Sequence, residues 1–425
     1  MTDDGDQSAA AAADAGDMAA KARAIYRGLS LAPMVRASTT PLRALALQYG
    51  ANFVYTEELV DRALMQTIRV ENKDLGTIDF IKDPASMSKK SLKKSNNRPC
   101  LILRIDPKVE AGKLVLQLGT GEPETALQAA KLVYKDVDAI DVNMGCPKKF
   151  SISGGMGSAL LDDPDRAARI VRTLKKEIPL PISCKIRLLK NAQATIEYIE
   201  TMMRAGVDAL AIHARRVGHD ATLKADWTTL TEVMATITSR YPEFPFLING
   251  DLYDRKERDE MLEKTKARGM LLARPALYNA STFLLEKNQP LLDKPTVIQE
   301  YLRLTVRYDI HYKNTKYVVC EMMSNRRTPT ERVSKMPLKF PGGQTVSNVC
   351  SCKDLQSLCQ LWNVDYEEAL KLVPSLTSPN DDNTAKAKQD TVMAAGEHKY
   401  ADDYFLKRDM HRTDEPESKR SRVEI

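Results

Sequence analysis

The sequence predicts an α/β fold, a (β/α)8 TIM barrel followed by a smaller C-terminal helical domain. Eight short apolar runs alternate with amphipathic stretches over residues 29–277, the order that gives a parallel sheet with outer helices. Most runs are uniformly apolar, as expected for strands buried on both faces. A doubly wound open sheet is the alternative, and the number of strands favours the barrel. The runs are Leu29–Met34, Phe53–Thr56, Leu114–Leu118, Ala139–Asn143, Ile182–Ile186, Ala209–His213, Phe246–Ile248 and Met270–Ala273.

Six stretches between these runs have the apolar spacing of helices. Several are followed closely by a residue that ends a helix, as at Gly50, Pro179 and Gly206. The stretches are Thr40–Tyr49, Glu122–Tyr134, Pro164–Lys176, Ala192–Ala205, Trp227–Thr238 and Glu257–Ala267.

Changes in composition divide the chain into four parts. Residues 1–24 are rich in Ala, Asp and Gly and are expected to be a disordered tail. The barrel is expected over residues 25–290, with a hairpin inserted at its rim over residues 77–106. A helical domain is expected over residues 291–375 and a second disordered tail over residues 376–425. The hairpin strands are Thr77–Ile81 and Cys100–Ile105, and the later helices are Thr296–Val306, Tyr317–Met323, Cys352–Leu361 and Val364–Leu372.

Composition and charge limit the class of protein. The 425 residues carry a formal net charge of +6, which is compatible with a polyanionic partner. The apolar runs are strand-sized and the N-terminus lacks the pattern of a secretory signal, so no membrane partner is expected. Seven cysteines, an odd number, argue for a reducing compartment, the cytoplasm and also the nucleus. Cys350, Cys352 and Cys359 fit no common zinc spacing, so no metal site is expected.

Two basic clusters allow two interpretations each. The cluster Lys419–Arg422 is either a nuclear signal or a solvated tail. The inserted hairpin carries a basic loop that is either a solvated linker or a contact for a phosphate backbone. The residues of this basic loop are Lys89, Lys90, Lys93, Lys94 and Arg98.

Polar side chains follow the apolar runs at their C-terminal ends. The active site of a TIM barrel lies at this end, so each such residue is a candidate. Because the middles of the same strands are apolar, packing explains these polar residues poorly. The candidates are Pro33-Met34-Val35-Arg36, Gln117, Asn143, Cys146, Lys185, Arg187, His213, Arg215, Asn249-Gly250-Asp251 and Ala273-Arg274.

The ends of the last two predicted strands suit a phosphate group. Loops after the seventh and eighth strands of TIM barrels often bind phosphate. Gly250 permits close approach of the backbone, and Arg274 can offer a bidentate fork, although an arginine paired to an acid is the alternative. A phosphorylated cofactor would then reach toward the first strand. There Gln117, Lys185 and the backbone of residues 33–35 could hydrogen-bond a heterocyclic ring.

Cys146 lies in a tight turn between Gly145 and Pro147 at the end of the fourth predicted strand. A thiol with an ordinary pKa of about 8.5 is mostly protonated at neutral pH and can act as a general acid. A nucleophilic role would need an activating base, and no Cys–His pair is evident, although His213 could lie close in the fold. A small buried apolar residue is the structural alternative.

Five ordered motifs resemble those of the tRNA-dihydrouridine synthases. They occur in the order found in that family, Ala273-Arg274 follows them, and Tyr55-Thr56-Glu57-Glu58-Leu59 resembles its eukaryotic members that act at position 20 of tRNA. The resemblance covers about residues 28–325. The motifs are Leu31–Arg36, Asn143–Pro147, Cys184–Arg187, Ile212–Arg215 and Asn249–Asp251.

The resemblance implies an activity, cofactors and a partner. A member of this family would reduce the C5–C6 double bond of a uridine in tRNA, at position 20 of the D-loop, with FMN as cofactor and NADPH as electron donor. Reduced FMN would deliver hydride from N5 to C6, and Cys146 would protonate C5. The base must leave the folded tRNA to stack on the flavin. The barrel would bind FMN, the helical domain would bind tRNA, and a monomer is expected.

The resemblance also implies roles for the strand-end residues. Cys146 would be the catalytic acid, and Asn143, Lys185 and Arg187 would face the uracil. The residues that would bind FMN are Pro33, Met34, Val35, Gln117, Lys185, His213, Asn249, Gly250, Asp251, Ala273 and Arg274.

The C-terminal part departs from the family pattern. Animal members often carry a double-stranded-RNA-binding domain, and no α-β-β-β-α pattern follows residue 330. The helical domain and the basic loop would then supply more of the phosphate contacts. Two other functions stay open. An FMN barrel that reduces a free small molecule has little use for the basic loop, and a non-catalytic RNA-binding barrel does not require Cys146 and a flavin site.

Overall fold

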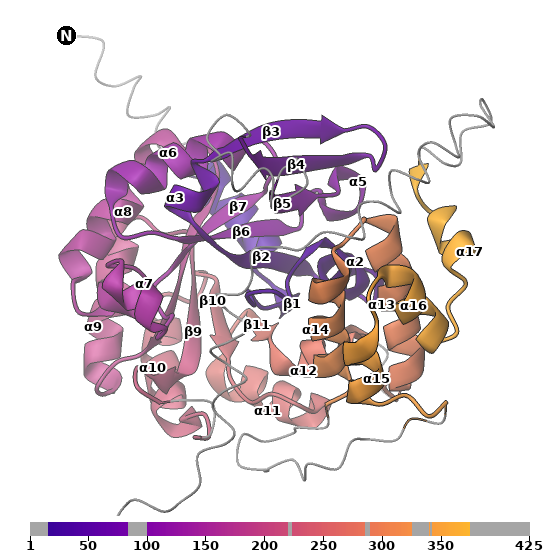
Figure 1. The fold of residues 1–425 in the computed structure, drawn as a ribbon. Coiled ribbons are helices and arrows are strands. Elements are labelled where there is room, and N and C mark those ends of the chain that lie inside the picture. The colour runs from indigo at the N-terminus through magenta and orange to yellow at the C-terminus, as the bar shows by residue number, and fades with distance from the viewer. Residues whose placement is uncertain are drawn as a thin grey trace, which may run out of the picture.

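A closed barrel of eight parallel strands forms the centre of the molecule (Figure 1), in the order β1-β11-β10-β9-β8-β7-β6-β2. The structure is a computed structural model that describes residues 16–83, 100–219, 223–284, 290–324, 340 and 342–374. Every predicted run forms one of these strands, which confirms the TIM barrel and rules out the open sheet. The strands are β1 (Gly28–Leu31), β2 (Phe53–Val60), β6 (Leu114–Gly119), β7 (Ala139–Asn143), β8 (Ile182–Leu188), β9 (Ala209–Arg216), β10 (Phe246–Asn249) and β11 (Gly269–Leu272).

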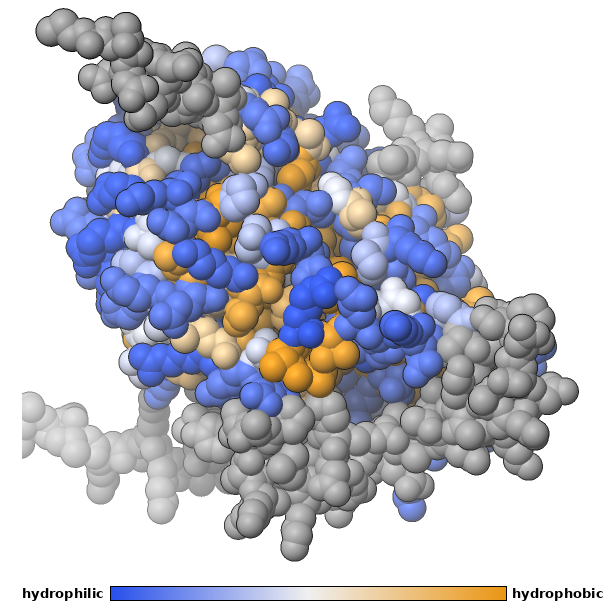
Figure 2. All heavy atoms as spheres, turned by 90° about the horizontal axis from the view of Figure 1, so that it is seen from above, coloured by the Kyte–Doolittle hydropathy of each residue, from blue (hydrophilic) through white to orange (hydrophobic). Residues whose placement is uncertain are grey.

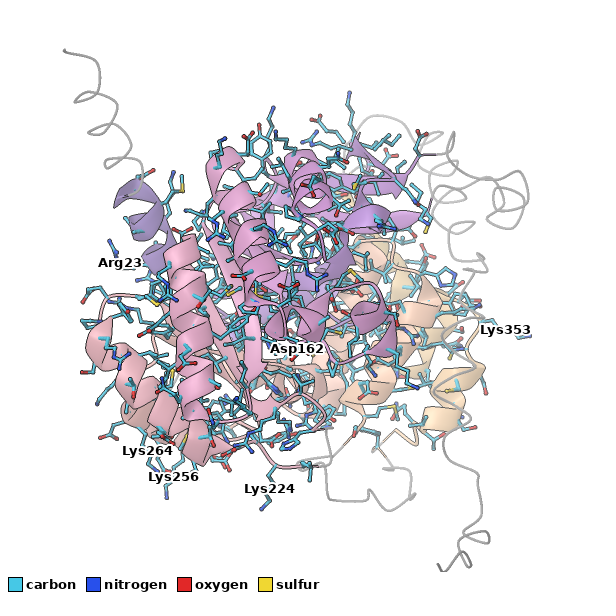
Figure 3. The ribbon with its side chains drawn as sticks, turned by 90° about the vertical axis from the view of Figure 1, so that its left-hand side faces the viewer. Arg23, Asp162, Lys224, Lys256, Lys264 and Lys353 are labelled. Carbon is cyan, nitrogen blue, oxygen red and sulfur yellow. The ribbon has the colours of Figure 1, made fainter. Side chains whose placement is uncertain are left out.

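Helices cover the outer face of the barrel. Outward-facing strand residues such as Ile140, Val142 and Ile212 are completely buried in the large apolar cluster that the strands share with these helices. Charged side chains of the outer helices, such as Lys256 and Lys264, point away from the barrel (Figure 3). The helices are α2 (Thr40–Gln48), α6 (Pro123–Val133), α8 (Pro164–Glu177), α9 (Ala192–Ala205), α10 (Trp227–Arg240) and α11 (Arg255–Thr265).

Shorter helices lie in the connections of the barrel. Two of them matter for the site, because α7 follows the turn of Cys146 and α12 follows β11. They are α3 (Asp61–Leu64), α5 (Pro107–Glu110), α7 (Lys149–Ser153), η2 (Gly157–Leu161), α12 (Arg274–Tyr278) and η3 (Ala280–Phe283).

Residues 16–25 are helical, so the predicted disordered tail over residues 1–24 is wrong for residues 16–24. Ala22 and the following Tyr26 belong to the apolar cluster that fills the N-terminal half of the barrel interior. The ring of Tyr26 meets that of Phe53 edge to face, with centroids 5.5 Å apart. Burial in the barrel therefore orders a segment whose composition alone indicates disorder. Residues 1–15 lie outside the described residues.

An antiparallel sheet of three strands is inserted between β2 and β6, in the order β3-β4-β5. The strands are β3 (Thr67–Asn72), β4 (Thr77–Lys82) and β5 (Leu101–Ile105). The predicted hairpin corresponds to β4 and β5, which pair directly. The additional strand β3 was not predicted, because its side chains are mostly exposed and polar. The basic loop of residues 89–98 lies outside the described residues.

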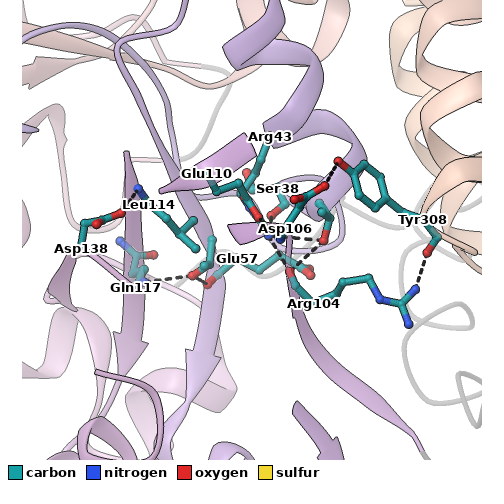
Figure 4. Close-up of polar contacts among 12 residues, drawn as sticks. Ser38, Arg43, Glu57, Arg104, Asp106, Glu110, Leu114, Gln117, Asp138 and Tyr308 are labelled. Carbon is teal, nitrogen blue, oxygen red and sulfur yellow. Dashed lines mark hydrogen bonds and ion pairs between the residues drawn. The ribbon is translucent and has the colours of Figure 1, made fainter. Parts of the chain in front are cut away.

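In the part of the chain that the structure describes, five helices follow the barrel: α13 (Lys294–Arg307), α14 (Tyr312–Met322), α15 (Val346–Ser351), α16 (Leu355–Leu361) and α17 (Tyr366–Leu370). Buried polar contacts join them to the inserted sheet (Figure 4). Arg104 forms an ion pair with Asp79 at 2.6 Å and donates to the carbonyl of Tyr308. The hydroxyl of Tyr308 donates to Asp106 at 2.8 Å. The contacts of α14 with α12 bring this helical part beside the C-terminal end of the barrel. The predicted tail over residues 376–425 lies outside the described residues.

The surface seen from above the view of Figure 1 is mostly hydrophilic, with apolar residues gathered in patches among charged ones (Figure 2). Within the ranges described above, no helix combines the length and the apolar character needed to cross a membrane.

Candidate active site

Polar and charged side chains line the C-terminal end of the barrel interior. Side chains of each strand alternate between inside and outside, and the inward positions change from apolar to polar toward this end. On β7, Ala139 belongs to the interior apolar cluster, whereas the inward-facing Asn143 is a buried polar residue. Neighbouring strands pair here so that Asn143 lies beside Lys185, and Arg187 beside His213. The closed barrel therefore gathers the predicted residues at one end.

The turn of Cys146 is held by the side chain of Asn143. The Oδ1 atom of Asn143 accepts hydrogen bonds from the backbone N–H groups of Gly145 at 2.9 Å and Cys146 at 3.0 Å. Gly157 packs under the turn with a φ of +59°, and a Cβ added there would lie 2.9 Å from the Cβ of Cys146. These contacts leave the cysteine side chain half-buried in a defined place.

The carboxyl group of Glu58 faces the thiol of Cys146. Burial and this carboxyl group together raise the pKa of Cys146 to about 11. Burial also raises the pKa of Glu58, although its contact with the thiol and the charge of Lys185 oppose the shift. The strand register shifts between Tyr55 and Glu58, and such an irregularity re-aims the side chains that follow it. The site therefore keeps the thiol protonated at neutral pH, as a general acid requires.

Lys185, which is partly buried, and Asp141, which is buried, carry opposite charges beneath this turn. Burial, and next the charge of Arg187, lower the pKa of Lys185 to about 8, whereas the carboxylate of Asp141 acts to raise it. Burial raises the pKa of Asp141 to about 6, against the hydrogen bonds from Gln117 and Ser183. Lys185 is thus a cation that changes charge close to neutral pH.

Asp251 joins two arginines from different strand ends. Its Oδ2 atom accepts from Nη2 of Arg215 at 2.6 Å and from the backbone N–H of Ala225 at 2.9 Å. Its Oδ1 atom accepts from Arg274. The structure thus shows an arginine paired to an acid, the alternative considered for Arg274. The side chain of Asp251 serves here to orient two guanidinium groups, and binding of phosphate by Arg274 stays a prediction.

His213 presents an unpaired polar atom at this end of the barrel. Its Nδ1 is buried without a hydrogen-bond partner, and burial together with nearby cations holds the pKa of this imidazole well below its usual range. A neutral imidazole with an unpaired nitrogen is suited to contact a bound molecule. Gly250 has a φ of +146°, and a Cβ added there would lie 3.1 Å from the Cβ of Ala225, so this position needs a glycine for the packing of the chain itself.

The loop after β1 reaches the helices that follow the barrel. The backbone N–H of Met34 donates to Oγ of Ser38 at 3.1 Å, and the side chain of Val35 is 54% exposed. Arg36 has a φ of +67°, and its guanidinium lies 4.3 Å from the ring centroid of Tyr317 on α14. The predicted ring-binding loop therefore lies between the barrel and α14.

Comparison with known proteins agrees with this geometry. A family profile described as "Dihydrouridine synthase (Dus)" matches residues 30–336. The chain belongs to this family. The fission yeast Schizosaccharomyces pombe has a relative named tRNA-dihydrouridine(20) synthase [NAD(P)+] that is 38% identical over 69% of this chain and 59% of its own length. A Saccharomyces cerevisiae protein of the same name is 33% identical over 71% of this chain and 78% of its own length.

A third relative is named for other positions in tRNA. The Schizosaccharomyces pombe tRNA-dihydrouridine(16/17) synthase [NAD(P)(+)] is 28% identical over 64% of this chain and 62% of its own length. The chain described here thus covers somewhat less than two thirds of the length of the first fission yeast relative, and a larger share of the length of the budding yeast relative.

In this dihydrouridine synthase family member, the structure places every predicted site residue at one end of the barrel. Their roles as ligands of flavin or uracil stay predictions. Sequence reasoning did not assign Glu58 or Asp141 to the site, although each of them bonds or faces a residue that it did assign. It named Arg215 as a strand-end candidate but gave it no role. Asp141 could have been found from its inward position two residues before Asn143. Glu58 could not, because the irregular strand pairing decides its direction.

Proposed function

We propose that this protein reduces a uridine in tRNA to dihydrouridine, with FMN as its cofactor and NADPH as the electron donor. One observation carries the proposal: the protonated, half-buried thiol of Cys146 lies at a barrel end that Lys185, Arg187, Arg215 and Arg274 make cationic. The names of the two yeast relatives state this activity for position 20 of tRNA. Identity is 38% with the first of them and 28% with the 16/17 synthase, which supports position 20 here.

The residues at the barrel end fit a phosphorylated flavin. The unpaired Nδ1 of His213 would be satisfied by a polar ligand atom. Arg215 and Arg274 offer guanidinium donors to a phosphate group. Lys185 would stabilise the negative charge that develops on a reduced flavin ring. FMN, when bound, is the redox group of the reaction and receives its electrons from NADPH.

The chain's own residues orient the uracil and move one proton. Arg187 is held against the Cys146 turn by a hydrogen bond from its Nε to the carbonyl of Gly145, at 2.7 Å. With Lys185 beside Asn143, two cationic donors therefore surround the place where the uracil carbonyl groups would lie. The thiol of Cys146 gives its proton to C5, and the thiolate that remains takes a proton back from water.

Residues that can contact the nucleic acid lie directly after Cys146 in the chain. Lys148 and Lys149, which follow Cys146 closely, are exposed and can contact backbone phosphates. The uridine must leave its stack to reach a thiol inside the barrel mouth.

The test is to map dihydrouridine in tRNA treated with the purified protein, FMN and NADPH. We expect a yellow protein with a flavin absorbance spectrum and one new dihydrouridine at position 20. Modification at another position would overturn the assignment to position 20. Reduction of a free pyrimidine or enone without reaction of tRNA would instead establish a small-molecule reductase. RNA binding by a protein that takes up no flavin would establish a non-catalytic barrel.

A further inference from the structure

A chain of buried hydrogen bonds runs through the barrel interior from its N-terminal end. The hydroxyl of Tyr26, at the end of the N-terminal helix, donates to Oγ of Ser183 at 2.9 Å. Ser183 donates to Oδ1 of Asp141 at 2.7 Å, and Nε2 of Gln117 donates to Oδ2 of the same carboxylate at 2.8 Å. All four residues are buried, with exposures between 0% and 2%. Asp141 is therefore the acceptor at the centre of this chain.

The chain continues from Gln117 to the turn of the catalytic cysteine. Nδ2 of Asn143 donates to Oε1 of Gln117 at 3.1 Å. The Oδ1 atom of Asn143 then accepts the backbone N–H groups of Gly145 and Cys146. A single line of contacts thus leads from a carboxylate in the barrel interior to the backbone of Cys146.

The ionised carboxylate of Asp141 determines which groups donate and which accept along this series of hydrogen bonds. A carboxylate only accepts hydrogen bonds, so the amide NH2 of Gln117 must point toward it. The amide oxygen of Gln117 then points toward Asn143, which must present its own NH2 there. That choice leaves the oxygen of Asn143 for the backbone N–H groups of the turn. A neutral amide in place of Asp141 could accept or donate, and both side-chain amides could then rotate by a half-turn.

Asp141 also acts on the charge of Lys185. Lys185 pairs with Asn143 across β7 and β8, and Asp141 lies two residues before Asn143 on the same inward face. From there its carboxylate favours the protonated ammonium group of Lys185, which charged groups from several other elements also face. The cation Arg187 opposes it. The titratable and charged groups around Lys185 are Arg187 on β8, Asp141 on β7, Cys146 after β7, Glu58 on β2 and His213 on β9.

We propose that Asp141 is a positioning residue that sets the orientation of the Cys146 turn through Gln117 and Asn143 and keeps positive charge on Lys185. The proposal rests on the proposed function, since it concerns the acid and the cation of that reaction. It predicts that loss of the carboxylate harms turnover more than flavin binding, because Asp141 lies below the site rather than at its mouth.

The experiment compares Asp141→Asn with the wild-type holoenzyme. The variant should keep its bound flavin, while kcat falls about 10- to 100-fold because the acid is misplaced. In the pH profile of kcat, the alkaline limb that we assign to Lys185 should shift to lower pH by about one unit. The reason is that a charge of opposite sign beside Lys185 has been removed. An unchanged kcat together with an unchanged alkaline limb overturns the proposal.

Two further variants separate positioning from simple loss of structure. Ser183→Ala removes one donor to Asp141 and leaves the carboxyl group in place, so kcat should fall about 3- to 10-fold with the alkaline limb in place, in line with one lost hydrogen bond. A shifted limb or a normal kcat in Ser183→Ala contradicts the proposal even if Asp141→Asn does not fold. Asp138→Asn is the matched control, because Asp138 lies just before β7, away from the Cys146 turn, and its carboxylate accepts from the N–H of Leu114 at 2.9 Å (Figure 4). This control should leave kcat and the limb unchanged.

A measurement without turnover distinguishes failure of this proposal from failure of the proposed function. Backbone amide exchange of the peptide that contains Gly145 and Cys146 should be faster in Asp141→Asn than in wild type, because the acceptor of these N–H groups has lost its fixed orientation. Equal exchange rates overturn the positioning role. A wild-type protein that forms no dihydrouridine overturns the proposed function, and the exchange measurement still decides the role of Asp141.

Discussion

The two halves of the barrel interior differ although the same strands build them. The N-terminal half contains Phe53, Val115, Ala139 and Leu247 and is closed by Tyr26. The C-terminal half contains the partly buried Lys185 and His213, with the buried Asp141 beneath them. One half supplies burial of apolar area and the other supplies charge, so stability and chemistry can be changed separately. The predictions below test this separation.

Loss of the general acid Cys146 should have the largest effect, and it should lower the rate of turnover without changing flavin binding or stability. Cys146→Ala loses the proton donor for C5, and general acid catalysis contributes about 10²- to 10⁴-fold. Dihydrouridine formation should fall by that factor, with bound flavin and the urea midpoint unchanged. Turnover at the wild-type rate would show that another group protonates C5.

A change in the apolar half should show the opposite pattern. Phe53→Ala leaves a cavity beside the ring of Tyr26 and should lower the free energy of unfolding by about 3–5 kcal/mol in urea denaturation. The kcat of the protein that stays folded should be close to that of wild type. Phe150→Ala is the matched control, because this phenylalanine is 49% exposed and should change stability by no more than about 0.5 kcal/mol.

Two arginines at opposite ends of β11 test where the flavin phosphate binds. Arg274→Ala should weaken flavin binding about 10- to 100-fold, because it removes hydrogen bonds from a charged donor to a phosphate. Arg268→Ala, at the other end of the strand, removes only a pair with the exposed Glu243 at 2.7 Å and should leave flavin affinity unchanged. Titration of the flavin-free variants with FMN, followed by fluorescence, measures both. Equal affinities would place the phosphate elsewhere.

The smallest effect concerns the pKa of the acid. Glu58→Gln removes a negative charge that disfavours the thiolate, so the pKa of Cys146 should fall from about 11. Alkylation of Cys146 at pH 8, followed by mass spectrometry of its peptide, should then be faster, by about tenfold for each pKa unit. Glu57→Gln is the control on the same strand, because the carboxyl group of Glu57 accepts from the backbone of Arg36. If the alkylation rate rose equally in both variants, Glu58 would have no specific effect on the pKa of Cys146.

Most of the barrel could be predicted because its strands are buried on both faces. Uniform apolar runs such as Ala139–Asn143 and Ala209–His213 are unusual outside a covered parallel sheet. The helix of residues 16–25 and the strand β3 were not predicted, for different reasons. The helix is ordered by burial against distant strands of the barrel. The strand β3 forms a hairpin with its neighbour β4, but its side chains are mostly polar and give little apolar signal.

The strand-end residues were predictable from the rule that barrel sites lie at C-terminal strand ends. Their contacts were not. Asp251 bonds Arg215 and Arg274 across three strand ends, and Glu58 faces Cys146 only because the pairing of β2 is irregular.

The sequence by itself determined the barrel, the order of its strands and which residues meet at the reactive end, since apolar periodicity and strand order are local properties. Only the tertiary structure decided that Cys146 stays protonated and that Asp141 lies beneath it. Burial and the sum of neighbouring charges set a pKa, and these depend on residues that closure of the barrel brings together.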